Sequence, residues 1–172
     1  MVIWLNGLSA SGKTTVGRRL AARLKERHEN VVYLDGDILR DVWGDKLGHD
    51  IPSRQINATR ISRFCGMLDK QGIHVVAAVM SMFPEWQAWN RANFSAYFEV
   101  LIDVPMEVLE RRESKGLYRG YRNGELNQVV GIDIPFPRPA NPDLVIDNSA
   151  DLPDPGVLAD RILAAMPLLS AP

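Results

Sequence analysis

The sequence predicts an α/β domain in which a central parallel five-stranded sheet carries helices on both faces. Short apolar runs alternate along the chain with longer amphipathic stretches, which is the order of strands and helices in such a domain. The runs are continuously apolar, as in strands that are buried on both sides of a parallel sheet. The stretch "GLSASGKTT" joins the first run to the first amphipathic stretch, where α/β domains commonly bind phosphate.

Each apolar run is expected to form one strand. The expected strands are residues 2–5, 31–34, 73–80, 97–104 and 143–148. One segment, 114–142, does not fit the alternation, because it is basic at first and then rich in Gly and Pro. It is too long for an ordinary connection, and such segments are usually lids or binding loops.

The amphipathic stretches are expected to form the helices. Val16, Leu20 and Leu24 recur at helical spacing and predict a helix over 13–27. Pro52 and Gly72 are a typical start and end for a helix. The other expected helices are 52–72, 84–96, a short one from Pro105 to 113, and 154–166.

Composition limits the class of protein. A length of 172 residues favours a single domain over 1–172, and 20 basic against 21 acidic residues gives no support to a nucleic-acid partner. Cys65 is the single cysteine, which excludes an internal disulfide and a cysteine-based zinc site. The longest apolar run, "HVVAAVMSMF", is too short to cross a bilayer, and no signal peptide precedes the first strand. We therefore expect a cytoplasmic protein without a membrane partner.

The phosphate-binding loop predicts a bound nucleoside triphosphate together with Mg²⁺. Gly7, Gly12, Lys13 and Thr14 fit the spacing G-x-x-x-x-G-K-[ST]. Backbone N–H groups of the loop would surround the phosphates, Lys13 would reach the β- and γ-phosphates, and the Thr14 hydroxyl would bind Mg²⁺. The loop residues expected to hold the nucleotide are Gly7, Ser9, Ala10, Ser11, Gly12, Lys13, Thr14 and Thr15.

A GTP-dependent switch is the alternative from another class. Such a protein needs a guanine-reading N-K-x-D stretch, and the sequence contains none. Residues 41–44, "DVWG", fit the short pattern D-x-x-G but fall in a helix-like segment. These observations favour a kinase that acts on a small metabolite.

The chain also resembles the adenylylsulfate (APS) kinase family, whose members transfer the γ-phosphate of ATP to the 3′-hydroxyl of adenosine 5′-phosphosulfate. The matching stretches include "GLSASGKTT", "LDGD", "FEVLIDVP", "RRESKGLYRGYRNGEL", "GID" and "NPDLVIDN", and they extend from residue 3 to about 148. The resemblance implies a P-loop kinase fold, a mobile lid over about 114–133, a small-molecule nucleotide substrate and a homodimer.

The resemblance also implies roles for individual residues. Asp35 and Asp37 would share two tasks, which are assisting Mg²⁺ and activating the acceptor hydroxyl. The family pattern gives Asp35 to the metal and favours Asp37 as the base. The residues alone leave this assignment open. Arg112 would lie near the adenine of ATP. The residues implied in acceptor binding are Arg40, Arg54, Asn57, Ser81, Lys115 and the positions of His49 and Val129. Arg119 and Arg122 are further cations on the expected lid.

The sequence departs from the family where the acceptor base would lie. Two phenylalanines that enclose the acceptor adenine in the family are His49 and Val129 here, and Pro84 replaces an arginine. Stacking on an aromatic ring contributes about 1–3 kcal/mol per base. Two interpretations follow: an APS kinase with an altered pocket, or a related kinase for a cytidine-type metabolite such as cytidine diphosphoramidate. A non-catalytic nucleotide-binding protein is a distant third, because such a protein would be expected to have lost Lys13 or the aspartates. Tryptophans that either line this pocket or pack helices are Trp43, Trp86 and Trp89.

Overall fold

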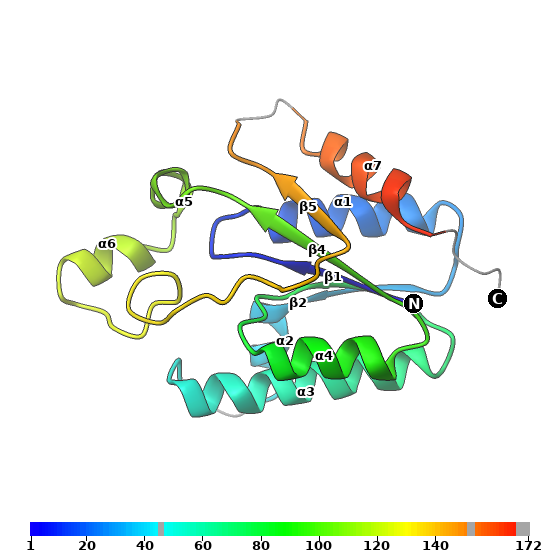
Figure 1. Cartoon of the computed structure of the whole chain (residues 1–172), viewed down its shortest axis with the longest axis horizontal. Coiled ribbons are helices and arrows are strands. Elements are labelled where there is room, and N and C mark those ends of the chain that lie inside the picture. Colours follow the sequence, from blue (N-terminus) through cyan, green and yellow to red (C-terminus); the bar gives the residue numbers. More distant parts are fainter. Residues whose placement is uncertain (45–46, 151–153, 168–172) are drawn as a thin grey trace.

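One parallel sheet organises the molecule in the computed structural model, which describes residues 1–44, 47–150 and 154–167. Its five strands lie in the order β2-β3-β1-β4-β5, and every neighbouring pair is parallel (Figure 1). The strands are β1 (Val2–Asn6), β2 (Val31–Asp35), β3 (His74–Ala78), β4 (Tyr97–Asp103) and β5 (Leu144–Asp147). The predicted fold class is confirmed.

Helices cover both faces of this sheet. The helices of the described residues are α1 (Lys13–Lys25), α2 (Gly36–Val42), α3 (Ile51–Asp69), α4 (Pro84–Asn93), α5 (Met106–Arg112), α6 (Leu117–Arg122) and α7 (Gly156–Ala165). Figure 1 shows α1 and α7 on one face, α3 and α4 on the other, and α5 and α6 beyond the ends of the strands. No helix in the described ranges is long and apolar enough to cross a membrane.

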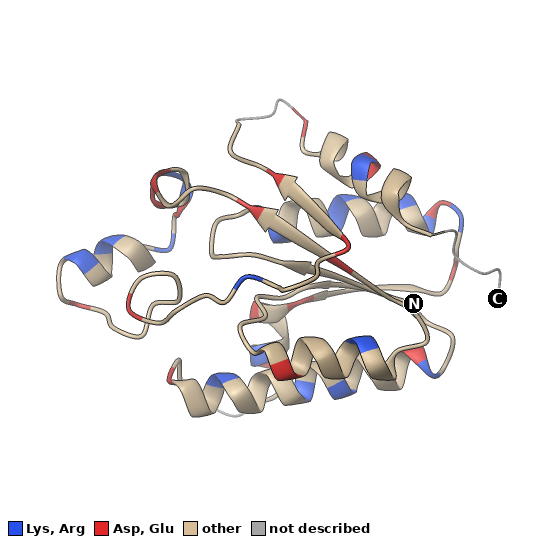
Figure 2. Ribbon diagram, viewed as in Figure 1, with Lys and Arg blue, Asp and Glu red and all other residues tan. Residues whose placement is uncertain are grey.

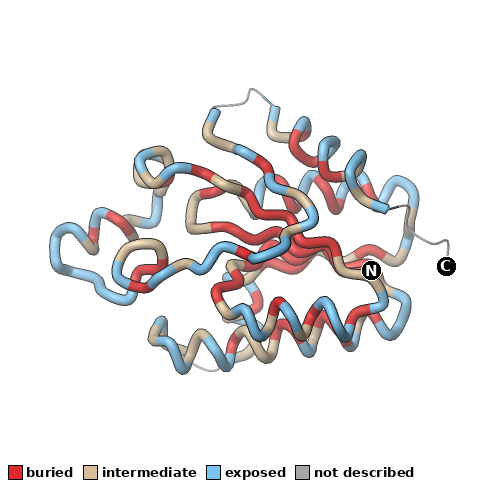
Figure 3. Tube along the Cα trace, viewed as in Figure 1, coloured by how far each residue is buried: buried red, intermediate tan, exposed pale blue. Residues whose placement is uncertain are grey.

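Two apolar clusters, one on each face, hold the layers together. The first joins buried side chains of β1 and β4, such as Ile3 and Val100, to Leu20 of α1 and Ile162 of α7. The second joins Trp4 to Ile61 and Cys65 of α3 and to Phe94 after α4. All five residues of β1 are buried, because this strand is central and covered on both sides, and Figure 3 shows the buried segments concentrated in the strands.

The ends of several elements differ from the sequence-based expectation. The α3 helix ends at Asp69 rather than at Gly72, because Gly72 already has left-handed φ of 76° and turns the chain toward β3. The α4 helix ends at Asn93, because Phe94 is extended at φ −85° and ψ 150° and inserts its ring into the core.

Two short helices were not predicted as separate elements. The Asp35 carboxylate caps α2 by accepting from the Asp37 N–H. In the segment after α5, Glu113 accepts from the N–H groups of Lys115 and Leu117 and starts α6. The Asp35 cap and the Glu113 contacts are both local, but neither residue lies in a long apolar pattern that would reveal a helix.

Basic and acidic residues are interspersed along the ribbon in Figure 2, with acidic residues also on β4 and β5. The carboxyl ends of β1 and β2 and the chain that follows β3 meet at one edge of the sheet. Ligands of open α/β sheets bind outside the carboxyl ends of the strands. The candidate site therefore lies where the loop after β1 meets Asp35 and Ser81.

Candidate active site

The loop between β1 and α1 has a backbone that requires glycine at two positions. Gly7 has φ 150° and Gly12 has φ 98°, and a Cβ at either position would come within 2.6 Å of Ile102 O or of Asn148 Nδ2. Ala10 also has a positive φ, at 63°. These conformations let the loop curve around a small volume at the start of α1, where N–H groups favour an anion.

Lys13 places its ammonium group inside that curve. Its Nζ donates to Gly7 O over 2.8 Å and to Leu8 O over 2.7 Å. Burial of the ammonium group lowers the pKa of Lys13 to about 8, against the opposing attraction of Asp37 and Asp35. The Lys13 residue as a whole is half-buried. A phosphate would restore the charged form.

This lowered pKa predicts a pH dependence for the free enzyme. Only charged Lys13 attracts phosphate oxygens, so kcat/KM for ATP should fall as pH rises through about 8. The measurement is kcat/KM for ATP over a pH series that brackets this value on both sides. Lys13→Arg is the control, because a guanidinium keeps its charge over this range, and whatever activity it retains should lack the alkaline fall. A flat wild-type profile would contradict the assignment.

Asp35 is the buried acid of the site. Its Oδ2 accepts from Thr14 Oγ1 over 2.8 Å and from Tyr33 Oη over 2.9 Å, and its Oδ1 accepts from the Asp37 N–H over 3.0 Å. Burial alone would raise its pKa, but these hydrogen bonds outweigh burial and lower the pKa of Asp35 below its usual value. Asp35 therefore carries a negative charge next to the hydroxyl of Thr14.

The pair of oxygens on Thr14 and Asp35 fits a hard divalent cation. Mg²⁺ prefers oxygen ligands and commonly takes only one or two from the protein, with substrate phosphates and water supplying the rest. No cluster of three His, Cys, Asp or Glu side chains suited to a metal occurs in the described part of the chain. The two protein oxygens predicted for Mg²⁺ are thus adjacent, and phosphate oxygens would have to complete the coordination.

Asp37 stands in the first turn of α2 and faces the segment 114–122. Its Oδ2 forms an ion pair with Nζ of Lys115, and both side chains are mostly exposed. The hydrogen bond to Asp37 raises the pKa of Lys115. On the same segment, Tyr118 Oη donates to Ser9 O over 3.1 Å. The segment 115–118 thus contacts both the phosphate-binding loop and Asp37.

Arg40 and Arg54 converge on the loop that contains His49. Arg40 Nη1 donates to Gly48 O over 3.2 Å, and Arg54 Nε donates to His49 O over 2.6 Å. Arg54 Nη2 also donates to Gln128 O over 3.0 Å, which links α3 to the chain between α6 and β5. Burial, and then the cations of Arg40 and Arg54, lower the pKa of His49. This corner is cationic, and its imidazole is neutral near pH 7.

The two positions that replace the family's phenylalanines have different environments. His49 is exposed. Val129 is 1% exposed, belongs to the core cluster on the α1 face, and donates its N–H to Asp133 over 2.5 Å. In this conformation Val129 presents almost no surface to a ligand, and an acceptor base could reach only the side of His49.

Ser81 is held by a side chain that sequence analysis did not identify. The Oδ1 atom of Asn6 accepts from the N–H groups of Gly7 and Ser81, each over 2.8 Å, and Asn6 Nδ2 donates to Ser81 O over 3.0 Å. Asn6 and Ser81 are both buried. The start of the phosphate-binding loop is therefore fixed to the segment after β3.

The three tryptophans near the site divide into two groups. Trp86 and Trp89 contact each other at a centroid distance of 5.4 Å, and Trp89 also contacts Phe94, so both pack within and beneath α4. Trp43 instead donates from Nε1 to Asn57 Oδ1 over 3.0 Å. Asn57 is 8% exposed.

Arg112 orders the chain that follows β5. Its guanidinium donates to the carbonyl oxygens of Asn148, Ser149 and Ala150.

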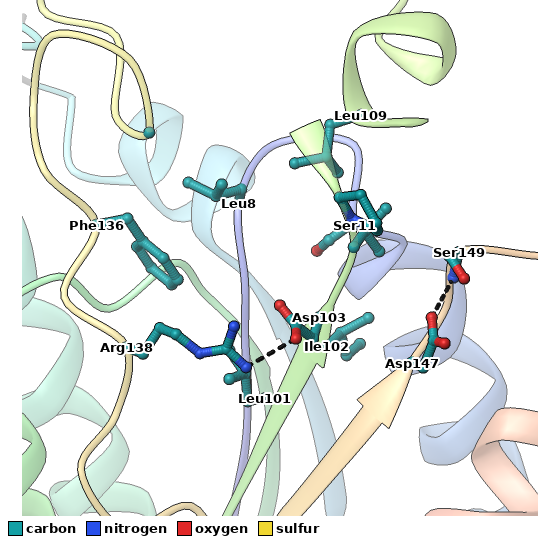
Figure 4. A pocket seen from close by; sticks show the side chains of 13 residues that line it. Leu8, Ser11, Leu101, Ile102, Asp103, Leu109, Phe136, Arg138, Asp147 and Ser149 are labelled. Atoms are coloured by element: carbon teal, nitrogen blue, oxygen red, sulfur yellow. Dashed lines mark hydrogen bonds and ion pairs between the residues drawn. The ribbon is translucent and has the colours of Figure 1, made fainter. Parts of the chain in front are cut away.

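A cavity of about 590 Å³ lies beside this chain and the phosphate-binding loop. Figure 4 shows Leu8, Ser11 and Ser149 on its walls, with the ion pair between Arg138 and Asp103 at one side. The cavity offers room next to the loop, with Arg112 behind one wall.

Two further residues of the site were missed from the sequence. Tyr33 lies two positions before Asp35 in β2, so strand alternation does place both on one face, and this signal was available. Asn6 offers only a weak signal, a polar residue at the end of an apolar strand. Its partners Gly7 and Ser81 are recognised only when β1 and β3 are known to be neighbours.

Comparisons with known proteins show which family the chain is similar to. The family model for adenylylsulphate kinase matches residues 1–147. The chain is 42% identical over 148 residues to the cytidine diphosphoramidate kinase of Campylobacter jejuni, covering 86% of each chain. It is 38% identical over 166 residues to the adenylyl-sulfate kinase of Paraburkholderia xenovorans, covering 95% of this chain and 90% of the relative. The solved APS kinase CysC of Mycobacterium tuberculosis, in complex with AMPPNP and APS, is similar at a TM-score of 0.85 with 33% identity, covering 95% of each chain.

Proposed function

The chain belongs to the adenylylsulphate kinase family, and we propose that it transfers the γ-phosphate of ATP to the 3′-hydroxyl of adenosine 5′-phosphosulfate. It is a phosphotransferase with an alcohol group as acceptor. The observation that carries the proposal is the contact of Lys13, Thr14 and Asp35 around one loop, with Asp37 beside it. Phosphoryl transfer needs mainly positioning and charge stabilisation, which these groups can supply.

Each group then has a distinct task. Lys13 stabilises charge on the transferred phosphoryl group, and Thr14 with Asp35 would hold Mg²⁺, which supplies further charge neutralisation when bound. Asp37 orients or deprotonates the acceptor hydroxyl. Asp35 is less suited to that task, because its oxygens already accept three hydrogen bonds.

The acceptor would occupy the cationic corner formed by Arg40 and Arg54. Both guanidinium groups now donate to main-chain carbonyls of the loop at 47–49, and the planar fork of arginine is suited to phosphate and sulfate. Asn57 and Ser81 would contact the remainder of the nucleotide. Residues 114–133 would act as the lid, with Lys115 leaving Asp37 to meet phosphate oxygens when both substrates are bound.

A second candidate acceptor is cytidine diphosphoramidate. It is favoured by the 42% identity to the Campylobacter jejuni enzyme and by the absence of phenylalanine at His49 and Val129. A pyrimidine needs less stacking area than adenine, and the corner offers only one open side, at His49.

The acceptor comparison tests the proposal directly. Purified protein with ATP and Mg²⁺ is given APS or cytidine diphosphoramidate, and kcat/KM is obtained from ADP release. Turnover of APS supports the proposal. Turnover of the cytidine compound without turnover of APS replaces the first candidate with the second, and turnover of neither removes both.

His49 provides the matching prediction. We expect His49→Phe to raise kcat/KM for APS about tenfold, because a stacking ring contributes about 1–3 kcal/mol, and to leave KM for ATP unchanged. His28→Phe is the matched control, since His28 lies against His74 rather than near Arg40. Adding Val129→Phe tests the second position, although Val129 is in the core and an extra ring there should also lower thermal stability. If neither His49→Phe nor the double substitution changes kcat/KM for APS, the missing phenylalanines do not govern acceptor choice.

The remaining expectations extend the family assignment. We propose a homodimer in the cytoplasm, without a nucleic-acid or membrane partner. Support for the dimer is the family resemblance, together with the exposed apolar side chains of Ile38, Val42, Ile51 and Ile56 on α2 and α3, which a second copy could cover.

A further inference from the structure

Trp43, directly after α2, is attached to α3 at two points. Its Nε1 donates to Oδ1 of Asn57 over 3.0 Å. Its ring meets that of Phe64 edge-on, with centroids 5.7 Å apart and planes at 86°. Asn57 and Phe64 lie about two helical turns apart on α3. The indole therefore has one fixed place and one fixed direction for its N–H.

The chemistry of indole decides which end of the Asn57 amide faces Trp43. An indole N–H can only donate, so its partner must be the carbonyl oxygen and not the NH₂ group. The NH₂ group of Asn57 has no hydrogen-bond acceptor among the described residues. It is nevertheless not one of the fully buried polar atoms that lack a partner. Asn57 therefore presents two donor hydrogens and keeps a narrow access to solvent.

That donor group lies in the acceptor corner. Asn57 follows Arg54 by one turn of α3, so the two side chains project from the same side of the helix. Arg54 in turn contacts His49 and Gln128. A nucleotide held by Arg54 would bring its base or sugar within reach of the next turn of this helix.

We propose that Trp43 is a positioning residue that fixes Asn57 as a hydrogen-bond donor to the base of the acceptor nucleotide. The inference rests on the proposed function. The donor recognises a lone pair on the base, either a ring nitrogen or a carbonyl oxygen, and rejects an amino group at the same place because two donors would face each other. Adenine and cytosine both offer such lone pairs.

Trp43→Phe tests this role, because phenylalanine can still lie against Phe64 but removes the N–H. KM for the acceptor should rise about five- to tenfold, since the Asn57 oxygen loses its partner and the amide can rotate. KM for ATP and kcat should stay within about twofold. The acceptor is APS or cytidine diphosphoramidate, whichever the wild type phosphorylates. Trp89→Phe is the matched control, with the same chemical change at a tryptophan that packs on Phe94.

An acceptor analogue gives a sharper readout. Two analogues are compared: in one a C–H replaces the accepting ring nitrogen of the base, and in the other, for a pyrimidine acceptor, a hydrogen replaces the carbonyl oxygen. The analogue that matters is the one that lacks the lone pair that accepts from Asn57. Wild type should bind the analogue several-fold more weakly than the parent acceptor. Trp43→Phe should bind the two compounds about equally. The effects of the protein change and the ligand change on binding would then be non-additive, which general destabilisation of the protein does not produce. Asn57→Asp covers the case of a poorly folded Trp43→Phe protein. It keeps an oxygen for Trp43 but replaces the donor with a charged oxygen that repels a lone pair of the base, so its KM for the acceptor should rise at least as much.

The failures are distinguishable. If an active wild type and Trp43→Phe share the same acceptor KM, or if KM for ATP rises equally, the inference is overturned while the proposed function stands. A wild type that phosphorylates neither acceptor removes the proposed function and the inference with it.

Discussion

Lys13→Ala is expected to lower kcat by about 10²–10³-fold in a protein that keeps its fold. Preorganised charge aimed at a developing anion commonly contributes this much, and the Lys13 ammonium is held inside the phosphate-binding loop by the carbonyls of Gly7 and Leu8. The fold should survive because Lys13 begins α1 without filling the core. The measurements are single-turnover phosphoryl transfer and circular dichroism.

Lys25→Ala is the matched control for that loss. Lys25 ends the same helix, is exposed, and lies a full helix length from the loop. Its replacement should leave kcat unchanged. Near-normal turnover in folded Lys13→Ala protein would remove Lys13 from the chemistry and would contradict the proposed kinase mechanism.

Asp37→Asn should lower kcat by about 10²–10⁴-fold with little change in KM for ATP. This range is typical for the loss of a general base, and asparagine keeps the shape of the side chain but cannot accept the hydroxyl proton. The main-chain hydrogen bond from Asp37 to Asp35 should persist, so the helix cap is retained. Steady-state kinetics with each substrate varied in turn separates the two effects.

Two controls make this result specific to Asp37. Asp41→Asn changes an exposed acid on the same helix and should leave kcat unchanged. Lys115→Met removes the ion pair with Asp37 but leaves the carboxylate, so it separates loss of the base from loss of the lid contact. An unchanged kcat in Asp37→Asn would transfer the role to Asp35 or leave the reaction without a protein base.

Most of the fold could be predicted because its determinants are local. Continuous apolar runs such as β1 can be stable only when covered on both faces, and the spacing of Val16, Leu20 and Leu24 marks the face of α1 that covers them. The phosphate-binding loop was recognised for the same reason, since Gly7 and Gly12 meet backbone requirements that few other residues satisfy.

Other features depend on contacts between distant parts of the chain and could not be predicted. The hydrogen bonds between Asn6 and Ser81 join residues 75 positions apart. The burial of Val129 depends on how the chain after α6 packs against the apolar cluster beside α1. The pairing of Trp43 with Asn57 depends on the crossing of α2 and α3. Family resemblance identified the positions of Asn57 and Val129, but physical packing determines which of their groups remain available to a substrate.

The most direct test of the proposed reaction follows the terminal phosphate of ATP. The protein is incubated with Mg²⁺, APS and ATP labelled at the γ-phosphorus, and the products are separated and identified. We expect the label on the 3′-oxygen of APS, formed at a rate that Lys13→Ala and Asp37→Asn both reduce by orders of magnitude. Label released as inorganic phosphate at the same rate with and without acceptor, or label that reaches no nucleotide hydroxyl, would contradict the proposed phosphoryl transfer.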